Sequence, residues 1–340
     1  MHHRKPSLSK ASRNNKHGQQ FRKYRKPTSS KHDPRKEECL TSHFNNVLLV
    51  VGLGSMSDFE SLPLYEIAYK KVFRNRVYCG PDFLSGEITF DGALFLKQNT
   101  RYGAFLYDCL TLALREHANY TGFIFVPENV LVNPKRLAFM NKNKIWVSNQ
   151  TKPGPVLYEQ TDTSLEWWSS PWGMQAIEKL FEYLVELSYY NRRKNKMTDG
   201  LWTSDWDTHQ LLNRWLWNGK GEYRTYWSNE TFLYLPARYS SLYLNATKHM
   251  RPSGVRQEIA LPTIVKMLEL DSNTQTVSAK LIEDSNSHIL DNRDQFRASI
   301  EEHGLLYASG KLRKDRRKLL NHMMFKEYGV GQFLKYNHCN

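Results

Sequence analysis

A short apolar run near residue 47 limits the possible folds of this chain more than any other segment. Val47-Leu48-Leu49-Val50-Val51 is apolar throughout and is followed by Gly52. A run that is apolar on both faces is typical of a central strand in a parallel sheet, which helices cover on both sides. The run therefore predicts a buried strand in an α/β fold.

Strands and helices alternate after this run. The predicted strands lie at 76–79, 122–126 and 144–147, with a further edge strand at 87–90. Apolar residues recur at helical spacing over 59–72 and 103–116, and these segments predict helices. Because such alternation favours right-handed crossovers, we expect a mostly parallel, doubly wound sheet.

The second half of the chain is rich in tryptophan and in helical patterns. Helices are predicted at 172–190, 203–217, 255–270 and 311–327, and a strand at 231–235. Pro262 interrupts the third of these helices, which is expected to be kinked or to begin late. Because no linker separates the halves 44–150 and 151–335, we expect one domain over 44–335, with the Trp-rich helical half packed on the sheet.

The first 43 residues are basic and nearly free of aliphatic side chains. Of the net charge of +14, residues 1–40 carry +9, from twelve Lys and Arg against Asp33, Glu37 and Glu38. Such a segment buries too little apolar surface to offset its chain entropy, so we expect a disordered basic tail. It would bind any polyanion weakly, and a solvated leader is the simpler interpretation.

Signals for metals, membranes and modification are weak. The four cysteines, at 39, 79, 109 and 339, lack metal-ligand spacing and indicate no redox compartment, and no H-x-x-x-H occurs, so a zinc enzyme is not expected. No window approaches the roughly 20 apolar residues of a membrane helix, and the first forty residues lack the apolar core of a signal peptide. If the protein works in the secretory pathway, we expect its targeting segment to lie outside this chain.

N-x-[ST] sequons stand at Asn119, Asn149, Asn229 and Asn245. Four sequons are close to the roughly three expected by chance.

Ligands of open α/β sheets bind at the carboxyl ends of the strands. The segments of interest are therefore Gly52, Gly54 and Ser55 after the first strand, and Gly80, Pro81 and Asp82 after the second. The first group lies in a segment similar to G-x-G-x-x-G. Ser57 takes the place of the third glycine, and no acidic residue follows about twenty positions on. A tight glycine turn close to a ligand or to another backbone segment is therefore favoured over a dinucleotide site.

Two carboxylates are candidates for chemistry. Glu128, with Asn129, follows the third strand, where a carboxylate can hold Mg²⁺ or Mn²⁺ on a diphosphate; a solvated loop residue is the alternative. Glu258 opens the apolar helix predicted over 255–270. There it is either a first-turn partner of the helix dipole or an active-site base.

Several segments resemble the STELLO-like glycosyltransferase family, in the family's order over most of residues 45–270. The most specific is Glu258-Ile259-Ala260-Leu261-Pro262-Thr263. The others are 47–51, 60–64, 78–81, 105–114, 122–125, 133–134, 144–146, Trp168 with Trp172-Gly173, and 234–236.

This resemblance implies a GT-A-like lumenal domain of a Golgi type II membrane protein, which transfers a sugar from a nucleotide-sugar to a glycan or glycoprotein. It implies a nucleotide-binding half over 44–150 and an acceptor half over 151–335. The nucleotide would lie against the turns after the first two strands, with Asp82 on the sugar. Glu128 and Asn129 would hold Mn²⁺ or Mg²⁺, and Glu258 would be the general base if the transfer inverts.

The chain departs from the family at its acidic pair, which falls on Glu128 and Asn129. Replacement of one carboxylate by an amide weakens a divalent site, so metal-independent, weak or absent activity is expected. Two alternatives follow. One is a catalytically inactive binding or scaffold protein of the same fold. The other is a cytoplasmic or nuclear protein whose tail and residues 311–318 bind nucleic acid, but the folded part carries no recognition motif, and no specific nucleic acid is expected.

Overall fold

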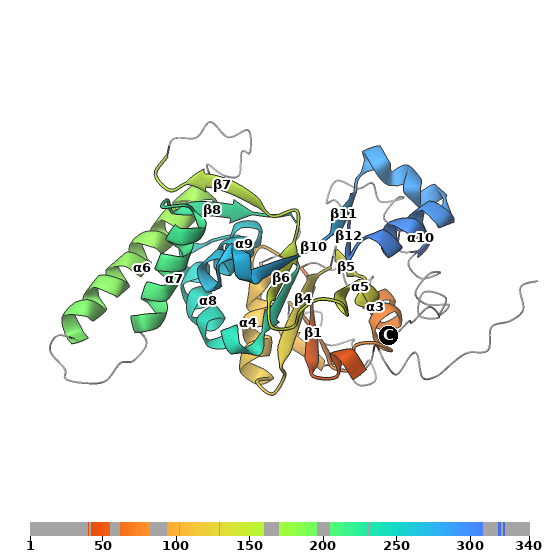
Figure 1. The fold of residues 1–340 in the computed structure, drawn as a ribbon, viewed down its shortest axis with the longest axis horizontal. Coiled ribbons are helices and arrows are strands. Elements are labelled where there is room, and N and C mark those ends of the chain that lie inside the picture. The colour runs from red at the N-terminus through yellow and green to blue at the C-terminus, as the bar shows by residue number, and fades with distance from the viewer. Residues whose placement is uncertain are drawn as a thin grey trace, which may run out of the picture. The chain divides into compact units, whose positions relative to one another are not determined.

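Among the residues that the computed structural model describes, seven strands form one mainly parallel sheet (Figure 1). Its order is β10 (Thr274–Val277), β6 (Ile145–Ser148), β9 (Leu233–Pro236), β4 (Gly122–Pro127), β1 (Val47–Gly52), β2 (Arg76–Gly80) and β3 (Leu94–Lys97). Only β9 runs antiparallel to its neighbours, β4 and β6. The expected α/β class and mostly parallel sheet are confirmed.

The described residues are 40, 42–54, 62–81, 94–101, 103–128, 130–159, 170–195, 205–229, 231–308, 319–320 and 322–323. All of them belong to the unit Pro34–Asn340, which is separate from Met1–Asp33. Most of the predicted basic tail, the predicted strand at 87–90 and most of the predicted helix at 311–327 therefore lie outside the described residues. Leu40 and Phe44, close to the predicted start of the domain, are buried in its core. No helix within the described part of the chain has the length and apolar character that crossing a membrane requires.

Strand β1 is buried on both faces, as its unbroken apolar run predicted. Val47, Leu49 and Val51 pack in a core shared with α3 (Leu62–Tyr69) and with residues near the end of the chain. Leu48 and Val50 belong to a second core on the other face. Its helices are α4 (Tyr107–Glu116), α6 (Met174–Asn195), α7 (Asp205–Asn218), α8 (Ser240–Ser253) and α9 (Gln257–Leu268). Figure 1 shows α6 to α9 gathered on one side of the sheet.

Smaller elements that the sequence did not predict complete the fold. A second sheet joins β11 (Ala279–Ile282), β12 (Leu305–Ala308) and β5 (Val130–Val132), and a hairpin pairs β7 (Lys152–Val156) with β8 (Arg224–Trp227). Helices α5 (Pro134–Leu137) and α10 (Arg293–Glu302) lie near the second sheet (Figure 1). Three 3₁₀ helices are also described: η2 (Ala237–Tyr239), η3 (Asp271–Asn273) and η4 (Asp284–Asp291). Buried Asn133 connects α5 to α10, since its side chain accepts from the backbone of Lys135 and donates to the carbonyl of Ile300.

A buried ion pair fastens α3 to β2. The guanidinium of Arg76 donates two hydrogen bonds to the carboxylate of Glu66, at 2.6 and 2.7 Å, and the Tyr78 hydroxyl donates a third at 2.8 Å. The side chains of Arg76 and Glu66 are only 4% and 9% exposed. Burial, followed by the charge of Glu66, raises the pKa of Tyr78 above its ordinary value, so the phenol remains a donor into the alkaline range.

We predict that Glu66→Ala destabilises the protein by about 3–5 kcal/mol, because it removes the carboxylate that accepts two hydrogen bonds from the buried Arg76 guanidinium. Urea unfolding followed by circular dichroism measures the change. Glu301→Ala is the control, because Glu301 forms an exposed ion pair with Arg297 at 3.0 Å, and such pairs contribute less than about 1 kcal/mol. Equal unfolding midpoints for the two variants would contradict the prediction.

Candidate functional site

The carboxyl ends of β1, β2 and β4 lie together at one edge of the main sheet. Gly52, the last residue of β1, lies opposite both Pro127 of β4 and Cys79 of β2. Strands β2 and β3 follow on one side of β1, and β4 lies on its other side, so the strand order reverses between β1 and β4. Open α/β sheets bind ligands at such a switch point. The predicted contacts Gly52, Gly80, Pro81 and Glu128 therefore lie along this carboxyl edge.

Not every predicted residue can be placed. Ser55, Asp82 and Asn129 lie outside the described residues, and their roles stay predictions. Glu128 is half-buried at the end of β4, and its backbone carbonyl accepts a hydrogen bond from the hydroxyl of Tyr65 in α3. The turn after β4 is thus attached to the helix that covers one face of the sheet.

The glycines after β1 pack closely against the segment that leads into α4. A Cβ atom added to Gly52 would lie 3.1 Å from the side chain of Leu106. Gly103 has a φ of +90°, and a Cβ there would lie 3.6 Å from the Cα of Gly54. This agrees with the interpretation of a glycine turn against another backbone segment, and it explains why helix α4 begins at Tyr107 rather than at the predicted residue 103.

The N-terminus of α9 reaches the same edge from the second half of the chain. The backbone of Gln257 donates to the carbonyl of Ala104 at 2.8 Å, next to Gly103. The Gln257 side chain donates to the hydroxyl of Thr231. Because β9 is antiparallel to β4, with Leu233 opposite Phe125, the segment that enters β9 at Thr231 lies at the carboxyl edge. These contacts bring Glu258, the second residue of α9, to the carboxyl edge of the sheet.

Pro262 has a structural role inside α9 that the sequence did not indicate. The helix begins at Gln257, two residues after the predicted start at 255, and continues through Pro262. A proline lacks the N–H that would bond to the carbonyl four residues earlier, and here that carbonyl belongs to Glu258. It accepts instead from the backbone of Ser228, at 2.9 Å. Because Pro262 cannot donate to the Glu258 carbonyl, that carbonyl is available to hold the β8–β9 connection at the start of α9.

Three consecutive polar residues form a cluster at this helix start. A guanidinium nitrogen of Arg256 lies 3.2 Å from a carboxylate oxygen of Glu258. Arg256 Nε, Gln257 Oε1 and Glu258 Oε2 are each buried without a hydrogen-bond partner among the described residues. Buried polar atoms are nearly always satisfied in proteins. Gln257 is itself only 6% exposed, so its free oxygen indicates a place for a ligand or an ordered water.

Sequence reasoning identified Glu258 but missed its neighbours Arg256 and Gln257. All three interrupt an otherwise apolar segment, 255–262, and that interruption was the available signal. Thr231 could not be recognised, because only the hydrogen bond to Gln257 brings it to the site.

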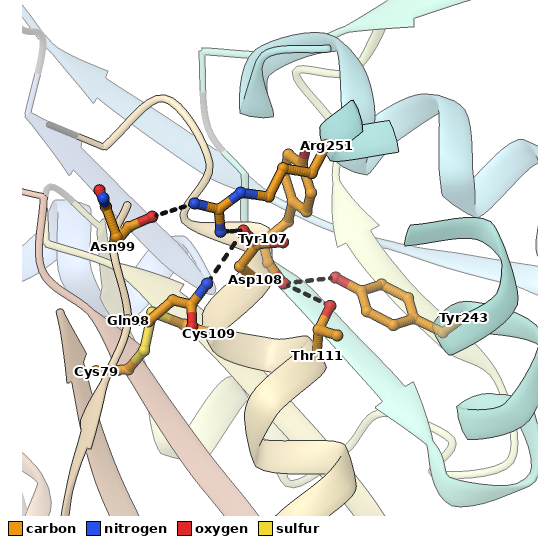
Figure 2. Close-up of a disulfide and its surroundings, with 9 residues drawn as sticks. All are labelled: Cys79, Gln98, Asn99, Tyr107, Asp108, Cys109, Thr111, Tyr243 and Arg251. Carbon is orange, nitrogen blue, oxygen red and sulfur yellow. Dashed lines mark hydrogen bonds and ion pairs between the residues drawn. A yellow bond between two sulfur atoms is a disulfide. The ribbon is translucent and has the colours of Figure 1, made fainter. Parts of the chain in front are cut away.

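A disulfide joins Cys79, the neighbour of Gly80 at the carboxyl edge, to Cys109 (Figure 2). Cys79 is the last residue but one of β2, and Cys109 is in the first turn of α4. Their Cα atoms are 5.6 Å apart and both side chains are fully buried. The bond holds the strand that ends at Gly80 onto the helix that follows Gly103. A separation of 30 residues carries no pattern from which the pairing could be predicted.

Polar contacts continue from the disulfide to α8. Asp108 forms an ion pair with Arg251 and accepts from Gln98 at 3.3 Å, while Arg251 donates to the carbonyl of Asn99 at 2.9 Å (Figure 2). Burial raises the pKa of Asp108, and the charge of Arg251 opposes this effect. Tyr243 of α8 donates to the Tyr107 carbonyl at 3.2 Å. These contacts join the ends of β3, α4 and α8.

A separate cleft of about 770 Å³ lies beside β6 and β10, and none of the predicted site residues lines it. Its charged side chains largely neutralise one another. Arg224 pairs with Glu222 at 2.9 Å, and Lys266 pairs with Asp271. Among the described residues, no group of three or more His, Cys, Asp or Glu side chains could hold a metal ion.

A scan against protein-family models and a search of curated proteins find no match to this chain. The resemblance to the STELLO-like family therefore stays a prediction.

We predict that replacing both Cys79 and Cys109 by alanine lowers the free energy of unfolding by about 3–4 kcal/mol, the loop-closure entropy of a cross-link of this span. Urea unfolding of the double variant and of the wild type, each without reductant, measures the loss. Wild type that has been reduced should unfold at a midpoint near that of the variant. An unchanged midpoint, or free labelling of Cys79 and Cys109 by a thiol reagent in unreduced wild type, would contradict the disulfide.

Proposed function

We propose that this chain is a STELLO-like glycosyltransferase of GT-A-like fold, which transfers a sugar from a nucleotide-sugar to a glycan or glycoprotein acceptor. The observation that carries the proposal is the placement of Glu258. It belongs to the segment that most resembles the family, and it is brought to the carboxyl edge by the contacts of Gln257 with Ala104 and Thr231. Gly52 and Gly80, which the same resemblance assigns to the nucleotide, end the neighbouring strands β1 and β2 at this edge.

The donor is proposed to lie across the ends of β1, β2 and β4. The absence of side chains at Gly52 and Gly103 lets the segment before α4 pack closely against these strand ends and fix their positions. The diphosphate would face the N-terminus of α9, where the helix dipole and the guanidinium of Arg256 favour negative charge. The orphaned Nε of Arg256 is suited to a phosphate oxygen.

Glu258 is proposed as the general base. Its carboxylate accepts the proton of the acceptor hydroxyl while that oxygen forms a bond to the anomeric carbon. The bond from the anomeric carbon to the diphosphate breaks, and the nucleoside diphosphate leaves with the electron pair. Inversion follows from attack opposite the leaving group, through an oxocarbenium-like state. Arg256 holds one oxygen of Glu258 and leaves the other for the acceptor.

A Mg²⁺ or Mn²⁺ ion fits this edge only if the protein and the diphosphate of the donor both supply its ligands. Glu128 is the described carboxylate at the predicted position, and Mg²⁺ is commonly held by one or two carboxylates together with substrate phosphates. Glu128, with Asn129 where it offers its amide oxygen, would hold such an ion, which would neutralise charge on the leaving diphosphate.

The buried disulfide supports the proposed location in the Golgi or elsewhere in the secretory lumen. Disulfides persist in oxidising compartments and are rare in the cytosol and nucleus. The disulfide favours this location over the cytoplasmic or nuclear nucleic-acid-binding alternative.

The direct test is turnover of a panel of nucleotide-sugars, with and without Mn²⁺, by wild type and by Glu258→Gln. Loss of a general base should slow sugar transfer and donor hydrolysis by about 10²–10⁴-fold, with little change in donor affinity by calorimetry. Glu302→Gln, at a 76% exposed side chain of α10, is the control and should retain wild-type rates.

The outcomes separate the proposals. Full activity in Glu258→Gln would overturn the assignment of the base. If the wild type binds a donor but turns over none, the result would favour the scaffold alternative. The presence of only one carboxylate, Glu128, where the family has a pair is the reason for that alternative. A wild type that binds no nucleotide-sugar would overturn the proposed function as a whole.

A further inference from the structure

The four N-x-[ST] sequons differ in how they sit in the fold. At Asn119, both the asparagine and its threonine, Thr121, are exposed. The other three sequons each have at least one of the two residues half-buried or buried: Asn149 with Thr151, Asn229 with Thr231, and Asn245 with Thr247. The fold therefore distinguishes sites that the sequence alone left equivalent.

Asn119 lies in the turn that joins α4 to β4, at the amino edge of the main sheet. The backbone and the hydroxyl of Thr121 donate to the carbonyl of Asn46 at 2.8 and 2.9 Å. These bonds hold the turn beside the start of β1 without using the Asn119 side chain. A group attached to that side chain would extend into solvent and displace no packed residue.

The other sequons serve structural roles or lie near functional features. Thr231 accepts the hydrogen bond of Gln257 at the candidate site, so a group on Asn229 would stand at that site. Asn149 accepts from the backbone of Ala279 at 3.0 Å and lines the cleft beside β6 and β10. Asn245 lies within α8, and Thr247 donates to the carbonyl of Tyr243 at 3.0 Å.

We propose that Asn119 carries an N-linked glycan. This proposal rests on the secretory location that forms part of the proposed function. In the transfer, Nδ2 of Asn119 loses a proton and forms a bond to the anomeric carbon of an oligosaccharide. The bond from that carbon to the diphosphate of its lipid carrier breaks, and the lipid diphosphate leaves with the electron pair. Acceptor sites of this kind are surface turns of secreted and lumenal proteins.

The position of Asn119 keeps the glycan away from the candidate site. Strand β4 begins at Gly122, just after the sequon, and ends at Pro127, beside Glu128. Six residues of extended strand separate the two edges by roughly 20 Å. A glycan at Asn119 therefore leaves the carboxyl edge open, whereas one at Asn229 would cover it.

The test uses tagged full-length protein isolated from the cells that produce it. Treatment with a peptide N-glycosidase should increase its electrophoretic mobility by one step. Asn119→Gln and Thr121→Ala should each abolish this step, because either change destroys the sequon. Thr121→Ser preserves the sequon and should retain the step, and Asn245→Gln is the matched control that should also retain it.

Peptide mapping of the same protein without reductant shows whether the Cys79–Cys109 bond is present. It therefore distinguishes failure of the glycan proposal alone from failure of the proposed lumenal location. An intact disulfide without a glycan on Asn119 would overturn the glycan but not the lumenal location. Free Cys79 and Cys109 without a glycan would overturn both. A mobility step that persists in Asn119→Gln would also overturn the assignment to Asn119.

Discussion

Burial of β1 on both faces is the interaction on which the rest of the structure depends. Its alternate residues enter two separate cores, one shared with α3 and the other with α4 and the helices of the second half. A strand in this position needs parallel neighbours on both sides, and β2 and β4 supply them. The pairing of Gly52 with Cys79 and Pro127 then brings three strand ends to one edge, which makes the candidate site a consequence of the core.

The second half of the chain completes that edge through a few directed bonds. Gln257 binds the segment before α4 on one side and the segment before β9 on the other. Pro262 contributes by leaving the Glu258 carbonyl free for Ser228. The disulfide joins β2 to α4, and the Asp108–Arg251 ion pair joins α4 to α8 (Figure 2). Glu258 and Arg256 thus stand on a supported helix start, and the proposed roles of base and anion-binding group require such fixed positions.

Features with a local pattern were predictable from the sequence, and features that depend on distant partners were not. The strand at Val47–Gly52, the strand at Gly122–Pro127 and the helix at Asp205–Asn218 follow from apolar runs and helical spacing, and the structure contains them. The antiparallel direction of β9, the second sheet and the disulfide depend on segments far apart in the chain. Glu258 was found because a charge in an apolar helix is conspicuous, whereas Thr231 has no such signal and is defined by its contact with Gln257.

The central claim is that the carboxyl edge beside β1 and β4 binds the diphosphate of a nucleotide. Amide NMR spectra of the isotope-labelled protein, titrated with nucleoside diphosphates in the presence of Mg²⁺, test this most directly because they locate the ligand without requiring turnover. The predicted result is a saturable shift of the amide signals of Gly52, Gly80, Gly103 and Gln257, with little change at Lys220 or Arg224 in the separate cleft. Shifts confined to the cleft, or no saturable shift with any nucleoside diphosphate, would contradict it.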